Sequence, residues 1–321
     1  MQDLIALNSI IPERNDVKID GRKAIHTDCN LCGADTYNLL WIKDSFRYVR
    51  CVDCGLVYIT PRLTEAEIAY IYDLGFESKS IQRPEPIDFS SYGSFFKQIS
   101  PYRKNNTILD VGCFRGYLLM AAKERSWRVF GTEISKRAAQ SASNSGLNVH
   151  LGSLPDAHYS ENYFDVISLF DVVEHLSDPM RYFREIRRIL RPGGLVYLET
   201  PNFDSLLRFL FGQNWCVFFP WHLYFFTKNT IEHMIIKAGL QLIGCKCENW
   251  GPLSRFNPYS SLNSNFTISK PRAMSSEFVR RYNNILKRPY LWAQSIANIP
   301  LRILSRFGFY TGSKLIILAE K

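Results

Sequence analysis

The stretch LDVGCFRGYL, residues 109–118, decides how the main part of this chain folds. An apolar run ends in Asp110, the chain turns through Gly112 and Gly116, and a helical pattern follows. A buried strand that passes through a glycine turn into a helix is typical of nucleotide-binding α/β sheets. The first question is therefore which nucleotide this turn can hold.

The turn lacks the features that a dinucleotide requires. Phe114 stands where a second glycine would let the backbone approach a pyrophosphate, and Tyr117 replaces the third glycine. No Gly-Lys-Ser/Thr follows, which argues against a Walker-type phosphate loop. The remaining D-x-G-x-x-x-G suits a nucleoside without phosphates, and the helix N-terminus after it favours a carboxylate.

A second carboxylate supports the nucleoside interpretation. Glu133 ends the next predicted strand, 23 residues after Asp110. A carboxylate at this place can accept hydrogen bonds from both ribose hydroxyls. The alternative is a solvated glutamate at a strand end, and the preceding glycine turn favours the ligand-binding role.

Strands and helices alternate from residue 107 onward, which predicts an α/β fold with a mostly parallel sheet covered on both faces. Asp178 and Pro179 begin the helix after the fourth strand, and the Gly193-Gly194 pair is expected to end it. The predicted strands are 107–111, 128–132, 148–151, 164–170, 195–200, 240–248 and 314–320, and the predicted helices are 115–126, 135–145, 179–190 and one that starts at Thr227.

Four of the eight cysteines form the pattern C-x2-C-x18-C-x2-C. They are Cys29, Cys32, Cys51 and Cys54. Two such pairs complete a four-thiolate zinc site, and Gly33 and Gly55 follow them as the tight turns require. The alternative, two disulfides, needs an exported protein, and the N-terminal residues show no export signal. We therefore expect a structural zinc ion in a small ribbon with short strands.

Charge is unevenly distributed along the 321 residues. Residues 251–321 contain eleven Lys/Arg and two Asp/Glu, whereas residues 1–60 contain seven Lys/Arg and eight Asp/Glu. The ribbon thus has no basic face with which to read nucleic acid. The basic residues of 275–307 accompany an apolar stripe at helical spacing, which predicts a packed helical insertion or, alternatively, contact with an anionic membrane or a lipid-linked acceptor.

The chain resembles class I S-adenosylmethionine-dependent methyltransferases, in particular the small-molecule branch that includes ubiquinone-biosynthesis O-methyltransferases. The resemblance covers about residues 93–250 and the last strand, and it is carried by ILDVGCFRGYLL, VFGTEIS, YFDVISLFDVVEHLSDP, LRPGGLVYLETPN and HLYFFTKNTIEHMIIKAGL. It implies a Rossmann-like seven-stranded sheet whose last strand is antiparallel. The domains expected are a zinc ribbon (1–60), a helical linker or cover (61–106) and a methyltransferase domain (107–321) with the basic helical insertion.

The resemblance also implies a set of residues that bind the donor, S-adenosylmethionine. Asp110, Gly112 and Gly116 would cradle its methionyl part, and Glu133 would hold the ribose. Leu154 would lie beside the adenine, and Phe170 would line the sulfonium side.

The methyl acceptor is less well defined. The DVVEHL loop after the fourth strand lacks the Asn/Asp-Pro-Pro-aromatic motif of enzymes that methylate base amino groups, and no cytosine-type nucleophilic cysteine motif is present. A small-molecule, glycan or lipid-linked acceptor is therefore expected, methylated at oxygen more readily than at carbon. Glu174, His175 and His222 are the candidate acid/base residues, and the alternative is that they only cap or pack.

Two other classes of protein stay open. One is an RNA methyltransferase with a zinc module, which the ribbon's lack of basic charge disfavours. The other is a catalytically inactive methyltransferase-like binding protein, for which Phe114 and Ser153 are the only hints. The most apolar stretch, 206–226, is interrupted by polar residues and makes a poor membrane span. A cytoplasmic protein is expected, with the inner membrane face as a possible peripheral location.

Overall fold

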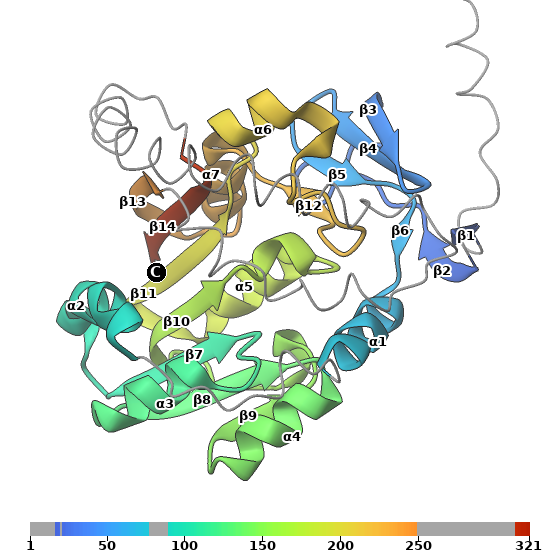
Figure 1. Ribbon diagram of the computed structural model, residues 1–321. Helices are drawn as coiled ribbons and strands as arrows, with labels where there is room; N and C mark the ends of the chain where they lie inside the picture. Colours follow the sequence, from blue (N-terminus) through green and yellow to red (C-terminus); the bar gives the residue numbers. More distant parts are fainter. Residues whose placement is uncertain (1–16, 20, 77–88, 249–311) are drawn as a thin grey trace, which may run out of the picture.

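A computed structural model describes residues 17–19, 21–76, 89–248 and 312–321, and a seven-stranded sheet forms its centre (Figure 1). Five strands and the edge strand β13 run in one direction, and β14 is antiparallel to both of its neighbours. The expected Rossmann-like sheet with an antiparallel last strand is therefore confirmed. In spatial order the strands are β13 (Gln241–Glu248), β14 (Lys314–Glu320), β11 (Leu190–Pro201), β10 (Phe164–Phe170), β7 (Thr107–Val111), β8 (Arg128–Glu133) and β9 (Asn148–Leu151).

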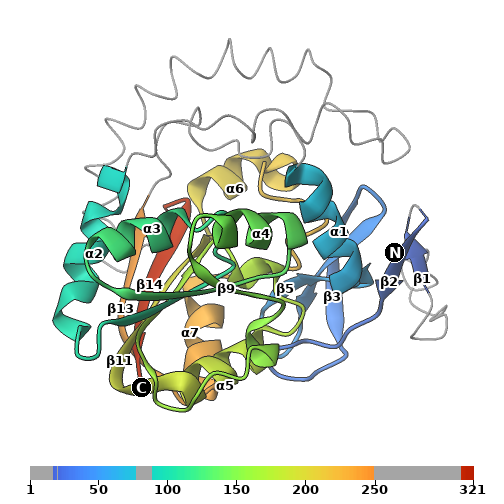
Figure 2. The same cartoon turned by 90° about the horizontal axis from the view of Figure 1, so that it is seen from below.

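Helices cover both faces of this sheet (Figure 2). One face carries α2 (Gly93–Ile99), α3 (Tyr117–Glu124) and α4 (Lys136–Asn144), and the other carries α5 (Pro179–Ile189) and α7 (Lys228–Lys237). Side chains cap three of these helices, and the cap at Asp178 was predicted from the sequence. The Ser135 hydroxyl caps α4, Asp178 caps α5, and Thr227 forms a capping box with Thr230 at the start of α7.

The helix that Asp178 begins does not end at the glycine pair, so that prediction was wrong. It ends at Ile189, and Gly193 and Gly194 lie inside β11. The chain enters the strand at Leu190, which pairs with Phe164, and the register shifts before the regular pairing resumes. Gly193 takes a left-handed conformation with φ 67°. Its N–H bonds the carbonyl of Lys321, so the pair forms a bulge at the start of β11.

The sheet of the N-terminal ribbon includes a strand from the main domain, which joins the two parts. Strands β3 (Tyr37–Lys43), β4 (Phe46–Cys51) and β5 (Val57–Ile59) are antiparallel, and β12 (Tyr224–Phe225), from the chain after the fifth strand of the main sheet, pairs with β5. A second small sheet contains β1 (Val17–Ile19), β2 (Arg22–Ile25) and β6 (Arg62–Leu63). Buried side chains of the ribbon and of the main domain form one continuous core.

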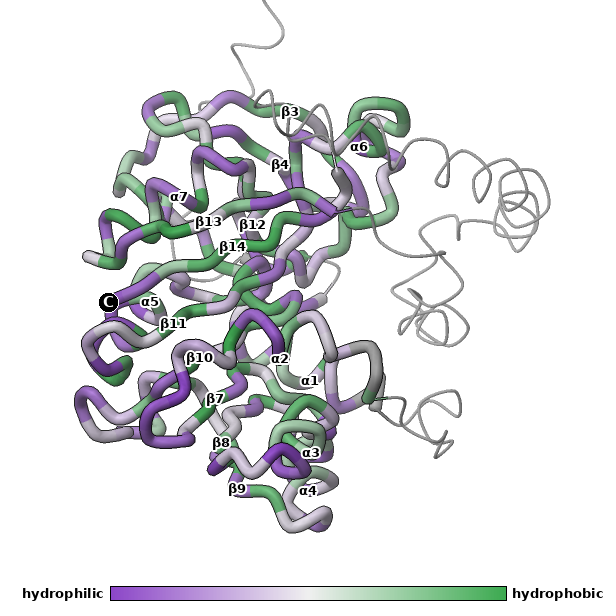
Figure 3. The backbone as a smooth tube through the Cα atoms, turned by 90° about the vertical axis from the view of Figure 1, so that its left-hand side faces the viewer, coloured by the Kyte–Doolittle hydropathy of each residue, from purple (hydrophilic) through white to green (hydrophobic). Residues whose placement is uncertain are grey.

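Two further helices flank the place where the strands of the main sheet end. Helix α1 (Glu65–Phe76) follows β6 and packs against α4. Helix α6 (Leu206–Phe211) is apolar and lies at the surface (Figure 3). Its Phe209 side chain is 73% exposed, whereas Phe203, Trp215 and Phe218 nearby in the sequence are buried.

The predicted basic insertion at 275–307 lies outside the described residues. Among the residues that the structure describes, no helix combines the length and the apolar character needed to cross a bilayer.

Candidate donor and acceptor site with a cysteine cluster

The glycine turn after β7 has the left-handed backbone that its sequence requires. Gly112 and Gly116 have φ values of 68° and 77°, and Phe114 between them also has a positive φ of 50°. A side chain at either glycine would collide with a neighbour. A Cβ on Gly112 would lie 2.7 Å from Cγ2 of Val172, and one on Gly116 would lie 2.2 Å from Cδ1 of Leu147. Gly116 therefore lets α3 pack closely, a reason that the sequence did not reveal.

Glu133 lies directly beside this turn. One of its carboxylate oxygens accepts the backbone N–H of Phe114 at 2.9 Å, and the other accepts that of Ser135 at 2.8 Å. The side chain is buried, and burial raises its pKa above the ordinary value even though the two N–H groups favour the charged form. Each carboxylate oxygen has two lone pairs, so both can still accept a ribose hydroxyl.

Asp110 is a second buried carboxylate at the end of β7. It accepts a hydrogen bond from the Ser168 hydroxyl at 2.7 Å. Burial raises its pKa to about 7, against the effect of the Ser168 hydroxyl, and the negative charge of Glu133 raises it further. A buried carboxylate without a cationic partner is costly in free energy, so this position favours a ligand that brings a positive charge.

The other two residues assigned to the donor lie on neighbouring strand ends. Leu154 is fully buried at the start of a short turn of helix, η4 (Leu154–Asp156), after β9. Phe170 ends β10, and its ring centroid lies 5.2 Å from those of Phe95 and Tyr197. Phe170 thus has aromatic support from α2 and from β11.

Two acceptor candidates, Glu174 and His175, lie in the segment between β10 and α5, residues 171–178, which we call the β10–α5 loop, and the third, His222, lies just before β12. Oε1 of Glu174 and Nε2 of His175 are 3.9 Å apart, and the ring of His222 lies edge-on to that of His175 with centroids 4.4 Å apart. The structure thus brings all three predicted residues together. Their potential ligand atoms lie within 4.8 Å of one another.

Burial controls the ionisation of this cluster. It lowers the pKa of His175 to about 4 and that of His222 well below its usual value, and the nearby His175 lowers the latter further. Both imidazoles are therefore neutral at pH 7. Burial also raises the pKa of Glu174 well above the usual value. Within the described residues, Oε1 of Glu174 and Nδ1 of His222 have no hydrogen-bond partner.

The structure adds residues that the sequence analysis did not assign. The Tyr72 hydroxyl, on α1, lies 2.8 Å from Nδ1 of His175, and the carbonyl of Trp221 lies 3.0 Å from the same nitrogen. A carbonyl can only accept, so it favours a proton on Nδ1 and a lone pair on Nε2. Asp171 begins the loop with a positive φ of 51°, and burial raises its pKa to about 7.

The glycine turn after β7, which we call the donor turn, lies against the β10–α5 loop. A side chain on Gly112 would collide with Val172 of that loop. Helix α1 contacts both sides. Next to Tyr72, the Asp73 carboxylate accepts the hydroxyl of Ser135 at 2.6 Å, and Ser135 in turn donates its N–H to Glu133. The donor turn, Glu133 and the β10–α5 loop therefore lie side by side.

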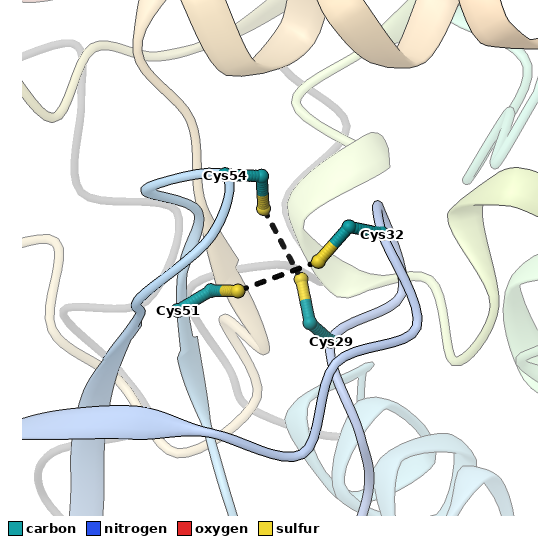
Figure 4. Close-up of side chains that lie close together, drawn as sticks. All are labelled: Cys29, Cys32, Cys51 and Cys54. Atoms are coloured by element: carbon teal, nitrogen blue, oxygen red, sulfur yellow. Dashed lines mark hydrogen bonds between the residues drawn. The ribbon is translucent and has the colours of Figure 1, made fainter.

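The four paired cysteines converge at one point of the ribbon (Figure 4). Sulfur atoms of Cys29 and Cys54, and those of Cys32 and Cys51, are 3.4 Å apart, and none of the four is in a disulfide. A tetrahedral zinc ion with bonds of 2.3 Å would place its sulfur ligands about 3.8 Å apart. The cluster therefore fits zinc with small adjustments.

The backbone around these cysteines forms two tight turns of the same kind. The N–H of Gly33 bonds the carbonyl of Cys29 at 2.8 Å, and that of Gly55 bonds the carbonyl of Cys51 at 3.1 Å. Burial raises the pKa of Cys29 to about 11. A cation at the centre of the cluster would reverse this effect, because bound zinc stabilises the thiolate form.

Comparison with known proteins shows what these features are similar to. Residues 87–244 match the model of the methyltransferase domain family. This part of the chain, which contains the donor turn, Glu133 and the β10–α5 loop, is similar to methyltransferase domains and makes up just under half of the sequence.

Several similar curated proteins are named ubiquinone biosynthesis O-methyltransferases, and the chain spans less than two thirds of the length of each of the two described here. A ubiquinone biosynthesis O-methyltransferase of Cereibacter sphaeroides is 30% identical over 161 residues, which cover 46% of this chain and 65% of that protein. The protein of the same name from Pseudomonas paraeruginosa is 32% identical over 103 residues, which cover 30% of this chain and 44% of that protein. Among solved structures, an S-adenosylmethionine-dependent methyltransferase of Archaeoglobus fulgidus aligns over 73% of this chain and 95% of its own, with 19% identity and a TM-score of 0.47.

Proposed function

We propose that this protein transfers a methyl group from S-adenosylmethionine to a small-molecule, glycan or lipid-linked acceptor, at oxygen more readily than at carbon. The observation that carries the proposal is the contact between two halves of one site within a methyltransferase domain. Buried Asp110 and Glu133 lie on the donor half, and the Glu174–His175 pair lies on the other. The similar proteins named O-methyltransferases support oxygen as the atom methylated.

On the donor half, each feature matches a part of S-adenosylmethionine. The Asp110 carboxylate lacks a cationic partner among the described residues and would bind the ammonium group of the methionyl part, beside Gly112 and Gly116. Glu133 would accept the ribose hydroxyls with the lone pairs that Phe114 and Ser135 leave available. Leu154 would lie against the adenine and Phe170 on the sulfonium side.

On the acceptor half, the chain supplies alignment and a base. S-adenosylmethionine contributes an electrophilic methyl group, which the acceptor oxygen takes as the carbon–sulfur bond breaks. His175 would remove the hydroxyl proton with Nε2, because Trp221 favours the proton on Nδ1. Glu174 would stabilise the imidazolium that forms. His222 is the alternative base, since it lies against the same ring.

We further propose that Cys29, Cys32, Cys51 and Cys54 hold one zinc ion. A site closed by four thiolates has no open position for a substrate, so the ion's role is structural. It supplies cross-links between two segments of the ribbon that share a core with the methyltransferase domain. The protein is expected in the cytoplasm, where the basic segment at 275–307 would provide any contact with the inner membrane face.

The experiment that tests the proposed function combines donor binding with turnover. Calorimetry should detect S-adenosylmethionine binding to the purified chain. Donor with a labelled methyl group, incubated with fractions of cell extract, should then label a lipid, a glycan or a small molecule. Label in RNA would replace the proposed acceptor class, and donor binding without transfer to any fraction would indicate a binding protein that lacks catalysis.

A further inference from the structure

A residue inside the first cysteine pair contacts the main domain at the end of the loop that carries the candidate base. Asn30 lies between Cys29 and Cys32, and its Nδ2 donates to Oδ1 of Asp178 at 2.8 Å. Its Oδ1 accepts the backbone N–H of Met180 at 2.9 Å. Asp178 is the last residue of the β10–α5 loop and the cap of α5. The side chain of Asn30 therefore joins the cysteine cluster to the end of the loop that carries His175.

Groups from β6 and from the segment just before β12 also hold this loop. The carbonyl of Ser177 accepts Nη2 of Arg62 at 2.8 Å, and the carbonyl of Glu174 accepts the N–H of Leu223 at 2.7 Å. Leu223 immediately precedes β12, which pairs with the ribbon strand β5, and its own carbonyl accepts the N–H of Ile59 at 3.0 Å. The loop is thus held from several sides, because β11 and α1 contact it as well, through the carbonyl of Glu199 and the carboxylate of Glu65.

The backbone hydrogen bonds within the β10–α5 loop hold it only weakly by themselves. The N–H of His175 bonds the carbonyl of Val172 at 2.9 Å, and that of Leu176 reaches the carbonyl of Val173 at 3.4 Å. Such a single short turn has little stability without tertiary contacts. The donor turn is held differently, because the N–H groups of Gly112 and Cys113 both bond the carbonyl of Thr132 in β8.

We propose that Asn30 is a positioning residue, through which the metal-bound cysteine pair sets the place of Glu174 and His175. The loaded cluster keeps the turn of residues 29–33 rigid, and Asn30 transmits that rigidity to Asp178 and α5. Loss of this link loosens the acceptor half of the site and leaves the donor half in place. The inference rests on the proposed function for its catalytic meaning, but the mechanical link is tested without it.

Hydrogen exchange of the full-length, zinc-loaded chain provides the test. In Asn30→Ala, the amides of His175, Leu176 and Leu223 should exchange about tenfold faster or more, because two hydrogen bonds, one of them to a carboxylate, are lost. The amides of Gly112 and Cys113 should keep their parental rates. Unchanged exchange at His175 and Leu176, in a variant with one equivalent of zinc, would overturn the proposal.

Swapping the asparagine and the aspartate between positions 30 and 178 distinguishes a specific hydrogen-bonded link from a general loss of stability. Asn30→Asp places two carboxylates against each other and should loosen the loop at least as much as Asn30→Ala. Adding Asp178→Asn restores a donor and an acceptor between the two positions, and asparagine also caps helices well, so exchange should return toward the parental rate. Failure of the double variant to slow exchange would count against the link. Asn38→Ala, at an exposed position of β3, is the matched control and should change nothing.

Metal removal and donor binding complete the design. Chelation of zinc from the parent should raise exchange in the same loop amides, and in Asn30→Ala it should add little there. Equal increases in the two proteins would mean that the metal acts on the loop by another route, against the proposal. Calorimetry with S-adenosylmethionine should give the same affinity for Asn30→Ala and the parent. No donor binding by either protein would contradict the proposed function while the exchange results still decide the role of Asn30.

Discussion

The hydroxyl of Tyr72 lies 2.8 Å from Nδ1 of His175, although 103 positions separate the two residues in the chain. Helix α1 thereby supplies a contact to the candidate base from outside the Rossmann-like sheet. The same nitrogen faces the carbonyl of Trp221, so two groups from different segments orient one imidazole ring. Orientation of a base by a partner on its far nitrogen is a common arrangement in acid/base sites.

Removal of this hydroxyl should affect turnover and spare donor binding. Tyr72→Phe keeps the ring that packs edge-on against His175 but loses one hydrogen bond. A neutral hydrogen bond contributes about 0.5–1.5 kcal/mol, so turnover should fall about 2- to 10-fold. The measurements are transfer of labelled methyl groups and calorimetry with the donor. A variant that turns over at the parental rate would show that Trp221 alone orients the ring.

Glu133 offers a test of the donor half. Glu133→Ala removes the acceptor of the ribose hydroxyls and should cost about 1.5–3 kcal/mol of donor binding. It also leaves the N–H groups of Phe114 and Ser135 without their acceptor, so some loss of thermal stability is expected. Glu133→Gln is the matched variant, because it keeps one acceptor oxygen. If the alanine variant binds the donor as tightly as the parent in calorimetry, the ribose assignment is wrong.

Donor affinity should depend on pH through Asp110. Burial raises the pKa of this carboxyl to about 7, so it loses its proton only as the pH rises through that value. A ligand ammonium binds the ionised form, and affinity should therefore increase from pH 6 to pH 8 and then level off. Asp110→Asn cannot ionise and should bind more weakly with a flat profile. A parental profile without any rise through pH 7 would remove the ammonium from this position.

The zinc site predicts one equivalent of metal. Elemental analysis of the purified chain should give about one zinc ion, as a single four-cysteine site requires. Replacement of Cys32 by serine should release the metal and lower thermal stability, because the ribbon shares its core with the main domain. Cys216, which is exposed and outside the cluster, provides the control position. Folded, metal-free protein with oxidised cysteines would contradict the assignment.

Sequence alone predicted those features that depend on local pattern. Buried apolar runs and caps placed the strands and helices, and the paired cysteines met as their spacing indicated. The error at Gly193-Gly194 arose because a glycine pair ends helices and also forms bulges, and only the pairing with β10 and the chain end decides between them. These pairing partners lie far away in the sequence, so a local sequence pattern does not reveal them.

Long-range contacts explain what the sequence missed in the site. The positions of Tyr72 beside His175 and of Asn30 beside Asp178 depend on how α1 and the ribbon dock, and docking is set by the whole core. Gly116 shows the same limit. Its left-handed backbone was implied by the turn, but the need to admit Leu147 was visible only in the packed structure.

The choice between the two histidines is the sharpest prediction about chemistry. If His175 is the general base, His175→Ala should keep donor affinity and lose about 10²–10⁴-fold in turnover. Burial lowers its pKa to about 4, so the base stays neutral at pH 7, and turnover at saturating donor should fall only as the pH drops toward 4. His222→Ala should then retain more turnover, because within the described residues its Nδ1 has no partner and His175 keeps its contacts with Tyr72 and Trp221. The reverse ranking of the two variants, with both folded and binding donor normally, would assign the base to His222.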